Sequence, residues 1–193
     1  AEAPVLEGKA LSALSHVLFF IHRLDEMAER SAEALDAAER SGNQALRALA
    51  LTFIARRRIT LGDLSEAKPM LDESIRIASM LDDKPALVAG LGWRGTLCFF
   101  ESEYDAAERA LTRALHLSAE LRDHFMLAFC RFFLALTCAN LGRISEALSS
   151  LEAITKMAER NGERYQVLKV PNSIGWIHRE LGDTDGALDR DRA

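Results

Sequence analysis

The chain has 193 residues, of which 49% are hydrophobic and 27% are charged, and its formal net charge is −5. That hydrophobic fraction is enough to build a core and excludes wholesale disorder. The acidic balance argues against a nucleic-acid-binding surface, because such a surface usually carries a basic stripe. Ala, Leu, Glu and Arg, the strong helix formers, are abundant and there are only 4 prolines, so the composition favours an all-α protein.

Targeting and redox signals are absent from the sequence. The first residues, AEAPVLEGK, lack the basic and apolar regions of a secretory signal peptide. No apolar run approaches the ~20 residues that span a bilayer. Cys98, Cys130 and Cys138 stand among apolar neighbours and do not suggest a disulfide framework. We therefore expect a cytoplasmic protein that binds neither membrane nor nucleic acid.

A short pattern recurs along the chain at a constant period of about 40 residues, a length typical of helical repeats. Five phased copies are the signature of such a protein, in which each unit stacks on its neighbours. About four and a half units are expected, over 4–43, 44–83, 84–123, 124–163 and 164–193. The copies read IHRLDEM at 21–27, LGDLSEA at 61–67, ESEYDAA at 101–107, LGRISEA at 141–147 and LGDTDGA at 181–187.

Each copy of the pattern indicates a turn between two helices. Gly62, Gly142 and Gly182 stand where a helix ends and the backbone needs a left-handed residue. Asp63 and Asp183 then offer N-cap side chains to the following helix. Polar breaks half a period away, such as Gly42-Asn43, separate the units. The expected helices span 4–21, 24–41, 44–61, 64–82, 84–101, 104–122, 124–141, 144–161, 164–181 and 184 to the end.

Small residues and prolines affect how these helices pack and whether they stay straight. An alanine recurs at one place in each later copy, where it permits close helix packing. The short turns force sequential helices to pack antiparallel. Pro69 and Pro171 fall inside expected helices, where a proline costs ~3 kcal/mol. Either these helices kink, or the last one begins near Pro171 and residues 164–170 form a separate turn. The recurring alanines are Ala67, Ala107, Ala147 and Ala187.

These residues carry a family resemblance. The pattern resembles tetratricopeptide repeats, with a small residue in each helix and a Gly-Asp-aromatic type of turn, although the period is about 40 residues instead of about 34. The longer variety is similar to repeats in large bacterial regulators, where an NTPase module is joined to a cyclase, kinase or DNA-binding output domain. Residues 172–183 resemble those repeats in particular. The positions that match the family's small and apolar positions are Gly95, Gly175, Ala55, Ala135, Ala107, Leu111 and Ala114.

The resemblance implies a right-handed α-solenoid of antiparallel helix pairs and covers almost the whole chain. We expect residues 1–193 to form a single solenoid. The helix expected from Thr184 would have about half the length of its counterparts. The chain is therefore expected to be a piece of a longer protein.

A search for chemistry gives no positive signal for an enzyme. The five histidines show no i, i+4 metal spacing, and no serine stands in a recognisable nucleophile elbow. Cys98 and Cys138 lie one repeat apart and could form a soft-metal or redox pair, but the favoured interpretation is that they are buried thiols at one core position of adjacent repeats. Gly90, Gly92 and Gly95 spell a dinucleotide motif inside a helix, where they serve helix packing instead. No enzyme activity, cofactor or metal is expected.

The family resemblance also implies where binding occurs, because the first helix of each pair lines the concave surface. Inward positions should recur once in every repeat, as in the series Arg56, Thr96, Leu136 and Trp176. Asparagine can hydrogen-bond an extended peptide, and aromatic side chains can act as anchors. Two of the phenylalanines could equally be core. The candidate groove residues are Thr52, Arg56, Phe100, Phe132, Asn140, Asn172, Trp176 and Arg179.

Three functions remain open from the sequence. The leading hypothesis is a protein-interaction or regulatory scaffold in a bacterial multidomain signalling or transcriptional regulator, with a protein or peptide partner. The second is a small-ligand sensor, whose curvature changes when an effector fills the groove beside the Arg56–Trp176 series. The third is a module that forms homo-oligomers through the open solenoid ends.

Overall fold

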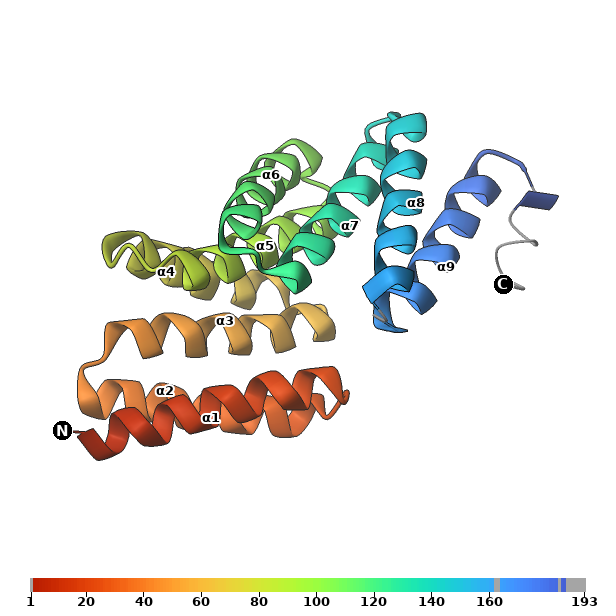
Figure 1. Cartoon of the computed structure of the whole chain (residues 1–193). Helices are drawn as coiled ribbons and strands as arrows, with labels where there is room; N and C mark the ends of the chain where they lie inside the picture. The colour runs from red at the N-terminus through yellow and green to blue at the C-terminus, as the bar shows by residue number, and fades with distance from the viewer. Residues whose placement is uncertain (1, 162–163, 184, 187–193) are drawn as a thin grey trace.

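The computed structural model describes residues 2–161, 164–183 and 185–186, and these are helices joined by short turns (Figure 1). The expected helices are confirmed to within two residues at each end, and the one expected from Thr184 lies outside the described residues. Among the described helices, none combines the length and the hydrophobicity that a bilayer span requires. The helices are α1 (Glu2–Phe20), α2 (Leu24–Ser41), α3 (Gln44–Leu61), α4 (Leu64–Met80), α5 (Lys84–Phe100), α6 (Tyr104–Leu121), α7 (His124–Asn140), α8 (Ile144–Asn161) and α9 (Arg164–Glu180).

Two layers of helices make up the molecule. Each helix packs on the next one in sequence, and the first helices of neighbouring pairs, α1, α3, α5, α7 and α9, also touch one another. The second helices, α2, α4, α6 and α8, touch only first helices in the described residues. The first helices therefore form the inner layer of an all-α helical-repeat solenoid, whose successive pairs rotate along the stack (Figure 1).

A left-handed residue ends the helices at regular intervals, half a repeat apart. The structure confirms this conformation at Gly62, Gly142 and Gly182, with φ of 78–86°. Non-glycine residues adopt it as well, at a cost of about 1–2 kcal/mol each, so helix packing dictates the turn even where the sequence does not favour it. These residues are His22, Asp82, Ser102 and Arg122, with φ of 52–60°.

Three of the first helices begin with a side-chain N-cap at the same repeat position. Asn43, Asp83 and Asp123, which stand one repeat apart, each accept a hydrogen bond from the backbone amide three residues on, at 3.0–3.1 Å. Each bond satisfies one of the free N–H groups of a helix start. These three side chains thereby fix the N-terminal ends of α3, α5 and α7 at one edge of the inner layer.

The structure corrects one expected N-cap and rules out one of the two alternatives left open for the last helix. Asp63 does not cap α4, because its carboxylate makes no bond to the helix amides and lies 3.3 Å from Nη1 of Arg58 instead. Helix α9 does not begin near Pro171 but runs unbroken from Arg164, and α4 likewise runs through Pro69. The N-cap expected at Asp183 is confirmed by a 3.0 Å hydrogen bond from the Gly186 amide.

The core lies between the two layers and repeats in register. The alanine expected at one position of α4, α6 and α8 is fully buried, and so is a leucine four residues later, while Ala187 lies outside the described residues. A small side chain allows the two helices of a pair to approach closely, and the leucine fills the space beside it. These residues are Ala67, Ala107, Ala147, Leu71, Leu111 and Leu151.

The three glycines of α5 mark close helix contacts, as the sequence indicated. A Cβ on Gly95 would lie 2.5 Å from Cγ of Leu111 and 3.2 Å from its backbone nitrogen. A Cβ on Gly92 would lie 2.6 Å from Cε of Met126, the mobile end of a flexible side chain. Of these two contacts, only the one at Gly95 involves backbone that cannot move aside.

We expect Gly95→Ala to lower the free energy of unfolding by about 1–3 kcal/mol through overpacking against α6. Gly92→Ala should stay within about 1 kcal/mol of the wild type, because Met126 can shift and alanine favours the helix. Urea unfolding followed by circular dichroism at 222 nm measures both. Equal losses for the two variants would contradict this account of the α5–α6 contact.

Candidate functional site

Aromatic rings gather on the inner layer of the solenoid. All nine phenylalanines of the chain lie on α1, α3, α5 and α7. Phe20 of α1 meets Phe125 of α7 at a ring-centroid distance of 5.0 Å, and Trp93 of α5 lies 6.0 Å from Phe19 and 4.7 Å from Phe129. Units of a solenoid generally contact only their neighbours. Here the rings join the first unit to the fourth across the concave face and divide that face into cavities.

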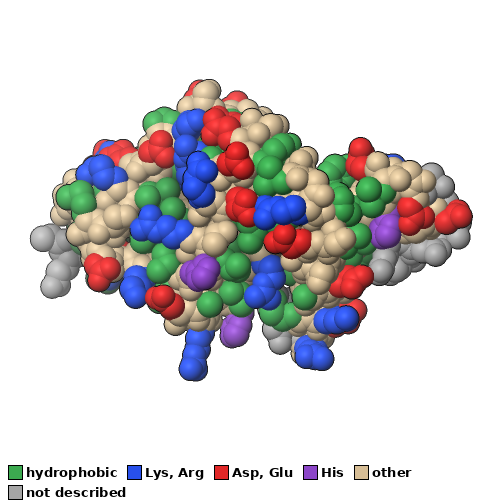
Figure 2. All heavy atoms as spheres, turned by 90° about the horizontal axis from the view of Figure 1, so that it is seen from above, with side chains coloured by type: hydrophobic (Ala, Val, Ile, Leu, Met, Phe, Trp, Pro, Cys, Tyr) green, Lys and Arg blue, Asp and Glu red, His purple; other side chains and the backbone are tan. Residues whose placement is uncertain are grey.

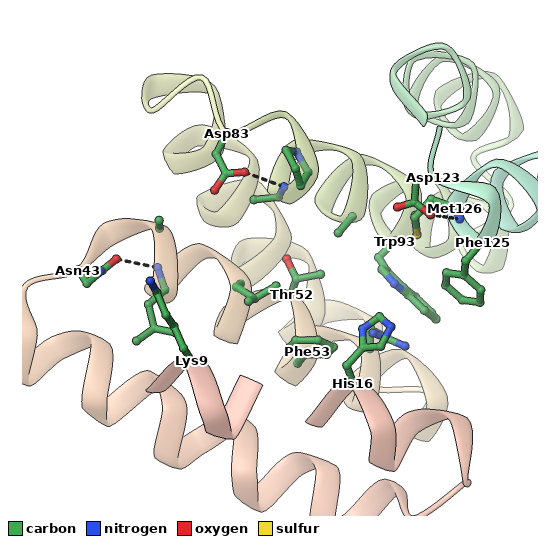
Figure 3. A pocket seen from close by; sticks show the side chains of 17 residues that line it. Lys9, His16, Asn43, Thr52, Phe53, Asp83, Trp93, Asp123, Phe125 and Met126 are labelled. Carbon is green, nitrogen blue, oxygen red and sulfur yellow. Dashed lines mark hydrogen bonds between the residues drawn. The ribbon is translucent and has the colours of Figure 1, made fainter. Parts of the chain in front are cut away.

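The first cavity, called here the Arg56 cavity, has a volume of about 520 Å³ and lies between α1, α3, α5 and α7. His16, Trp93 and Phe125 point toward one another from three different helices (Figure 3). Four side chains that carry charge or hydrogen-bonding groups complete the lining, and three of them cap the helix starts described above. They are Lys9, Asn43, Asp83 and Asp123.

Arg56 is the central charge of this cavity. Its side chain is only 4% exposed, and its guanidinium carbon lies 3.7 Å from the ring centroid of Phe19, 4.7 Å from that of Trp93 and 5.0 Å from that of Phe53. Desolvated cation–π contacts of this kind are worth up to about 2 kcal/mol each. The rings therefore hold a positive charge at a fixed place in the cavity wall.

Arg57 and Arg58 form a cluster of three adjacent arginines with Arg56 but point away from it, because neighbouring residues of a helix face different directions. Arg57 pairs with Asp25 of α2, and Arg58 lies within 3.3 Å of carboxylates of Asp63 and Glu66. On the face shown in Figure 2, acidic and basic side chains alternate without a large area of one sign. The cluster therefore does not form a basic patch.

His16 stands beside Arg56 among rings, with its centroid 5.1 Å from Phe20, 5.9 Å from Phe53 and 6.4 Å from Phe125. Burial lowers the pKa of His16 from its ordinary value, the charge of Arg56 lowers it further, and Asp123 opposes both. The imidazole is therefore mainly uncharged at neutral pH.

A second cavity, the Phe100 cavity, lies on the other side of Trp93, which lines both. It measures about 700 Å³, and its lining contains the imidazole of His22 and the larger rings of Phe19, Trp93, Phe100, Phe129 and Phe133. Its described lining contains no Asp, Glu, Lys or Arg. This cavity suits apolar groups but offers little that could orient a ligand.

The third cavity, the Trp176 cavity, has a volume of about 530 Å³ and lies between α5, α7 and α9. Asn172, Trp176 and Arg179 line it from α9, with Leu136 from α7. The residues that the sequence placed in one groove are thus divided among three cavities.

The structure places the remaining candidate residues as follows. Thr52 and Arg56 line the Arg56 cavity, and Phe100 is 53% exposed at the cavity named after it. Phe132 is 2% exposed in the core and offers no surface to a ligand. Asn140 is exposed but lines none of the described cavities, and its amide donates to the backbone oxygen of Leu136 at 2.9 Å.

Sequence reasoning missed His16 and the ring series Phe53, Trp93 and Phe133. These three rings occupy one repeat position, one residue beyond the candidates Thr52 and Phe132, and therefore point about 100° around the helix from those two side chains. Three aromatic residues at one repeat position are a signal that could have been used. The contact of α1 with α7 leaves no such pattern.

The cysteines lie in the core, as the sequence predicted for buried thiols at a repeated core position. All three are buried free thiols, and burial raises the pKa of Cys130 to about 12 and that of Cys138 to about 11. Cys98, Glu101 and Glu103 lie close enough to hold a metal ion, but Nζ of Lys68 already sits 3.3 and 3.6 Å from the two carboxylates. The group is therefore an ion-pair network in this structure.

Comparison with known proteins identifies the fold class. The sequence matches no known protein family and no curated protein. The solved structure of apo RapI is similar to 96% of this chain over 81% of its own, at 14% identity and a TM-score of 0.69. A Rap protein complexed with Competence and Sporulation Factor is similar to 100% of this chain over 63% of its own, at 14% identity and a TM-score of 0.77.

Two further structures extend this result. Nearly identical TPR-like repeats of a putative kinesin light chain from Podosopora anserina match 100% of this chain over 94% of their own, at 15% identity and a TM-score of 0.67. Aspartyl phosphate phosphatase F from Bacillus subtilis matches at 10% identity and a TM-score of 0.71, and this chain spans 59% of it. These likenesses establish a fold: the chain is a TPR-like α-solenoid. At this identity they establish no function.

We expect the wild-type free energy of unfolding to fall as the pH drops below about 6.5, because the unfolded chain binds a proton at His16 more tightly than the folded chain does. NMR titration of the imidazole tests the cause. Arg56→Met should raise the His16 pKa, and Asp123→Asn, which keeps a capping oxygen, should lower it further. If both variants left the midpoint of the His16 titration unchanged, the influence of Arg56 and Asp123 on its pKa would be contradicted.

Proposed function

We propose that this chain is a non-catalytic binding module whose Arg56 cavity holds a short segment of a protein partner. The observation that carries the proposal is the cavity itself. It lies between four helices, and its volume of about 520 Å³ falls in the range of about 300–1,000 Å³ typical of ligand sites. Aromatic walls supply contact area, and fixed polar groups supply orientation.

The lining of the Arg56 cavity favours a particular kind of segment. An aromatic or branched aliphatic side chain fits between Phe53, Trp93 and Phe125, where buried anchors give most of the binding energy. Lys9 and Asp123 provide charges of opposite sign, which would select the flanking residues of the segment. A peptide with one apolar anchor between charged residues is therefore the expected ligand.

Two further considerations support a protein partner and a regulatory setting. One TPR-like structure similar to this chain is a Rap protein complexed with Competence and Sporulation Factor. The resemblance of residues 172–183 to repeats of bacterial multidomain regulators supports the proposal that the module acts beside a signalling or transcriptional output domain. Thr52 carries the only hydroxyl group among the described lining residues. This hydroxyl is already hydrogen-bonded to the Ala48 carbonyl and the Ser74 hydroxyl. Because it is engaged in the fold, the lining favours ligand binding over catalytic turnover.

A small-ligand sensor is the second candidate, and the ring contact between α1 and α7 favours it. Phe20 and Phe125 meet across the concave face, beside the Arg56 cavity. A molecule that enters the cavity and displaces Phe125 would alter the distance between the first and fourth units. Ligand binding would then change the curvature of the whole solenoid.

The test fills the cavity without removing core side chains. Ala89 lines the cavity and is only partly buried, so Ala89→Trp should block it, whereas Ala119→Trp on the exposed surface of α6 serves as the matched control. Peptides selected on the wild type from a displayed random library should bind Ala89→Trp at least about tenfold more weakly and the control unchanged, by fluorescence anisotropy.

The outcomes separate the candidates. No selectable peptide, together with a thermal shift from a metabolite that Ala89→Trp abolishes, would favour the sensor. Peptides that bind Ala89→Trp as well as they bind the wild type would place the site elsewhere. Selected peptides that the chain chemically alters on incubation would contradict the non-catalytic proposal.

A further inference from the structure

The Phe100 cavity lies inside the concave face, with a mainly apolar wall built from four successive units. Helices α1, α5 and α7 contribute its aromatic rings, and α3 adds Ile59 and Leu61. No Asp, Glu, Lys or Arg stands among the described residues of this wall. An ionised group would lose its water there without gaining an ion pair, so the cavity disfavours a charged ligand.

The hydroxyl groups of this cavity are engaged in the fold. The Thr96 side chain is fully buried and donates to the Gly92 carbonyl at 3.1 Å, and the Thr60 hydroxyl donates to the Arg57 carbonyl at 2.8 Å. A peptide that entered the cavity would bring backbone N–H and C=O groups, which need hydrogen-bond partners. The wall offers few such partners, so the cavity suits a small molecule better than a peptide segment.

Phe100, at the mouth of the cavity, departs from the repeat pattern. Its side chain is 53% exposed, yet the same position carries Thr60, Asn140 and Glu180 in the second, fourth and fifth units. In the first unit the position carries Phe20, whose ring belongs to the contact between α1 and α7. The repeat therefore accepts a polar residue at this helix end, and the fold does not by itself require an aromatic side chain at the mouth.

The rings around the cavity are inclined to one another. The Phe133 ring lies 5.0 Å from that of Phe129 and 6.2 Å from that of Phe100, and the Trp93 ring lies 6.0 Å from that of Phe19. The two planes in each of these pairs meet at 56–87°. An aromatic ligand can therefore meet the wall through offset or edge-to-face contacts, which are the geometries that aromatic pairs prefer.

We propose that the Phe100 cavity binds a small, uncharged aromatic molecule. Its volume of about 700 Å³ lies within the range of about 300–1,000 Å³ typical of small-molecule sites. Ring contacts and shape, instead of hydrogen bonds, select the ligand. The site is separate from the peptide site proposed for the Arg56 cavity, although Trp93 lines both, and neither proposal depends on the other.

The test uses two fluorescent probes that share one ring system. N-phenylnaphthylamine is uncharged, whereas anilinonaphthalene sulfonate carries an added sulfonate on the same rings. Each probe is titrated with the full chain, and the rise in its emission measures binding. The uncharged probe should saturate a single site and bind at least about tenfold more tightly than the sulfonate, whose charge would be desolvated. Equal affinities would overturn the proposal.

Substitutions at one repeat position locate the site. Thr60 is exposed and lines the cavity, whereas Asn140, two units later, is exposed and lines none of the described cavities. Thr60→Trp should therefore weaken the uncharged probe at least about tenfold, and Asn140→Trp should leave its binding unchanged. Phe100→Asn introduces the residue found at position 140. It should keep the helical circular dichroism of the wild type and weaken the probe severalfold.

Ala89→Trp separates this site from the Arg56 cavity, which it fills. This variant should bind the uncharged probe as the wild type does. Binding lost in Ala89→Trp but retained in Thr60→Trp would place the probe in the Arg56 cavity and overturn the proposal, without affecting the peptide proposal. Binding retained in both Thr60→Trp and Phe100→Asn, or no binding to the wild type, would overturn it as well.

Discussion

The unvarying length of the repeat unit is the constraint on which the rest of this structure depends. Because no unit gains or loses a residue between positions 21 and 187, equivalent side chains meet equivalent neighbours in every layer. Alanine and leucine stay fully buried at their repeat positions in α4, α6 and α8, and the helix starts of α3, α5 and α7 are capped at one edge. An insertion of one residue in any unit would rotate its helices by about 100° and turn the core face outward.

The cavities follow from what stands on the inner layer once that register is set. Rings on α1, α5 and α7 reach across the concave face, and Phe20 meets Phe125 from three units away. Rings around Arg56 keep its charge in a dry wall, and the same charge helps hold His16 neutral. The result is a cavity whose apolar walls and fixed charges come from four different helices, which suits recognition of a specific partner.

Much of the fold could be predicted from the sequence because its determinants are local. Polar breaks and glycines predicted where the helices end, and the glycines of α5, such as Gly95, predicted a close helix contact. The N-cap predicted at Asp63 was wrong because the carboxylate pairs with the nearby Arg58 instead, and capping preferences do not take such a cation into account. The candidate site could be predicted only in part. Arg56 and Trp176 do line cavities, but the division of the groove depends on rotation between units and on side chains that meet across it, neither of which within-unit spacing encodes.

The central claim is that a ligand enters the Arg56 cavity, and the two tryptophans test it most directly. Trp93 lines the Arg56 and Phe100 cavities, and Trp176 lines the third. Emission spectra of Trp176→Phe and Trp93→Phe, recorded while a selected peptide is titrated, distinguish binding at the two cavities beside Trp93 from binding at the Trp176 cavity. The account predicts a shift in Trp176→Phe, where only Trp93 emits, and none in Trp93→Phe. A shift confined to Trp93→Phe would contradict it and move the site to the Trp176 cavity.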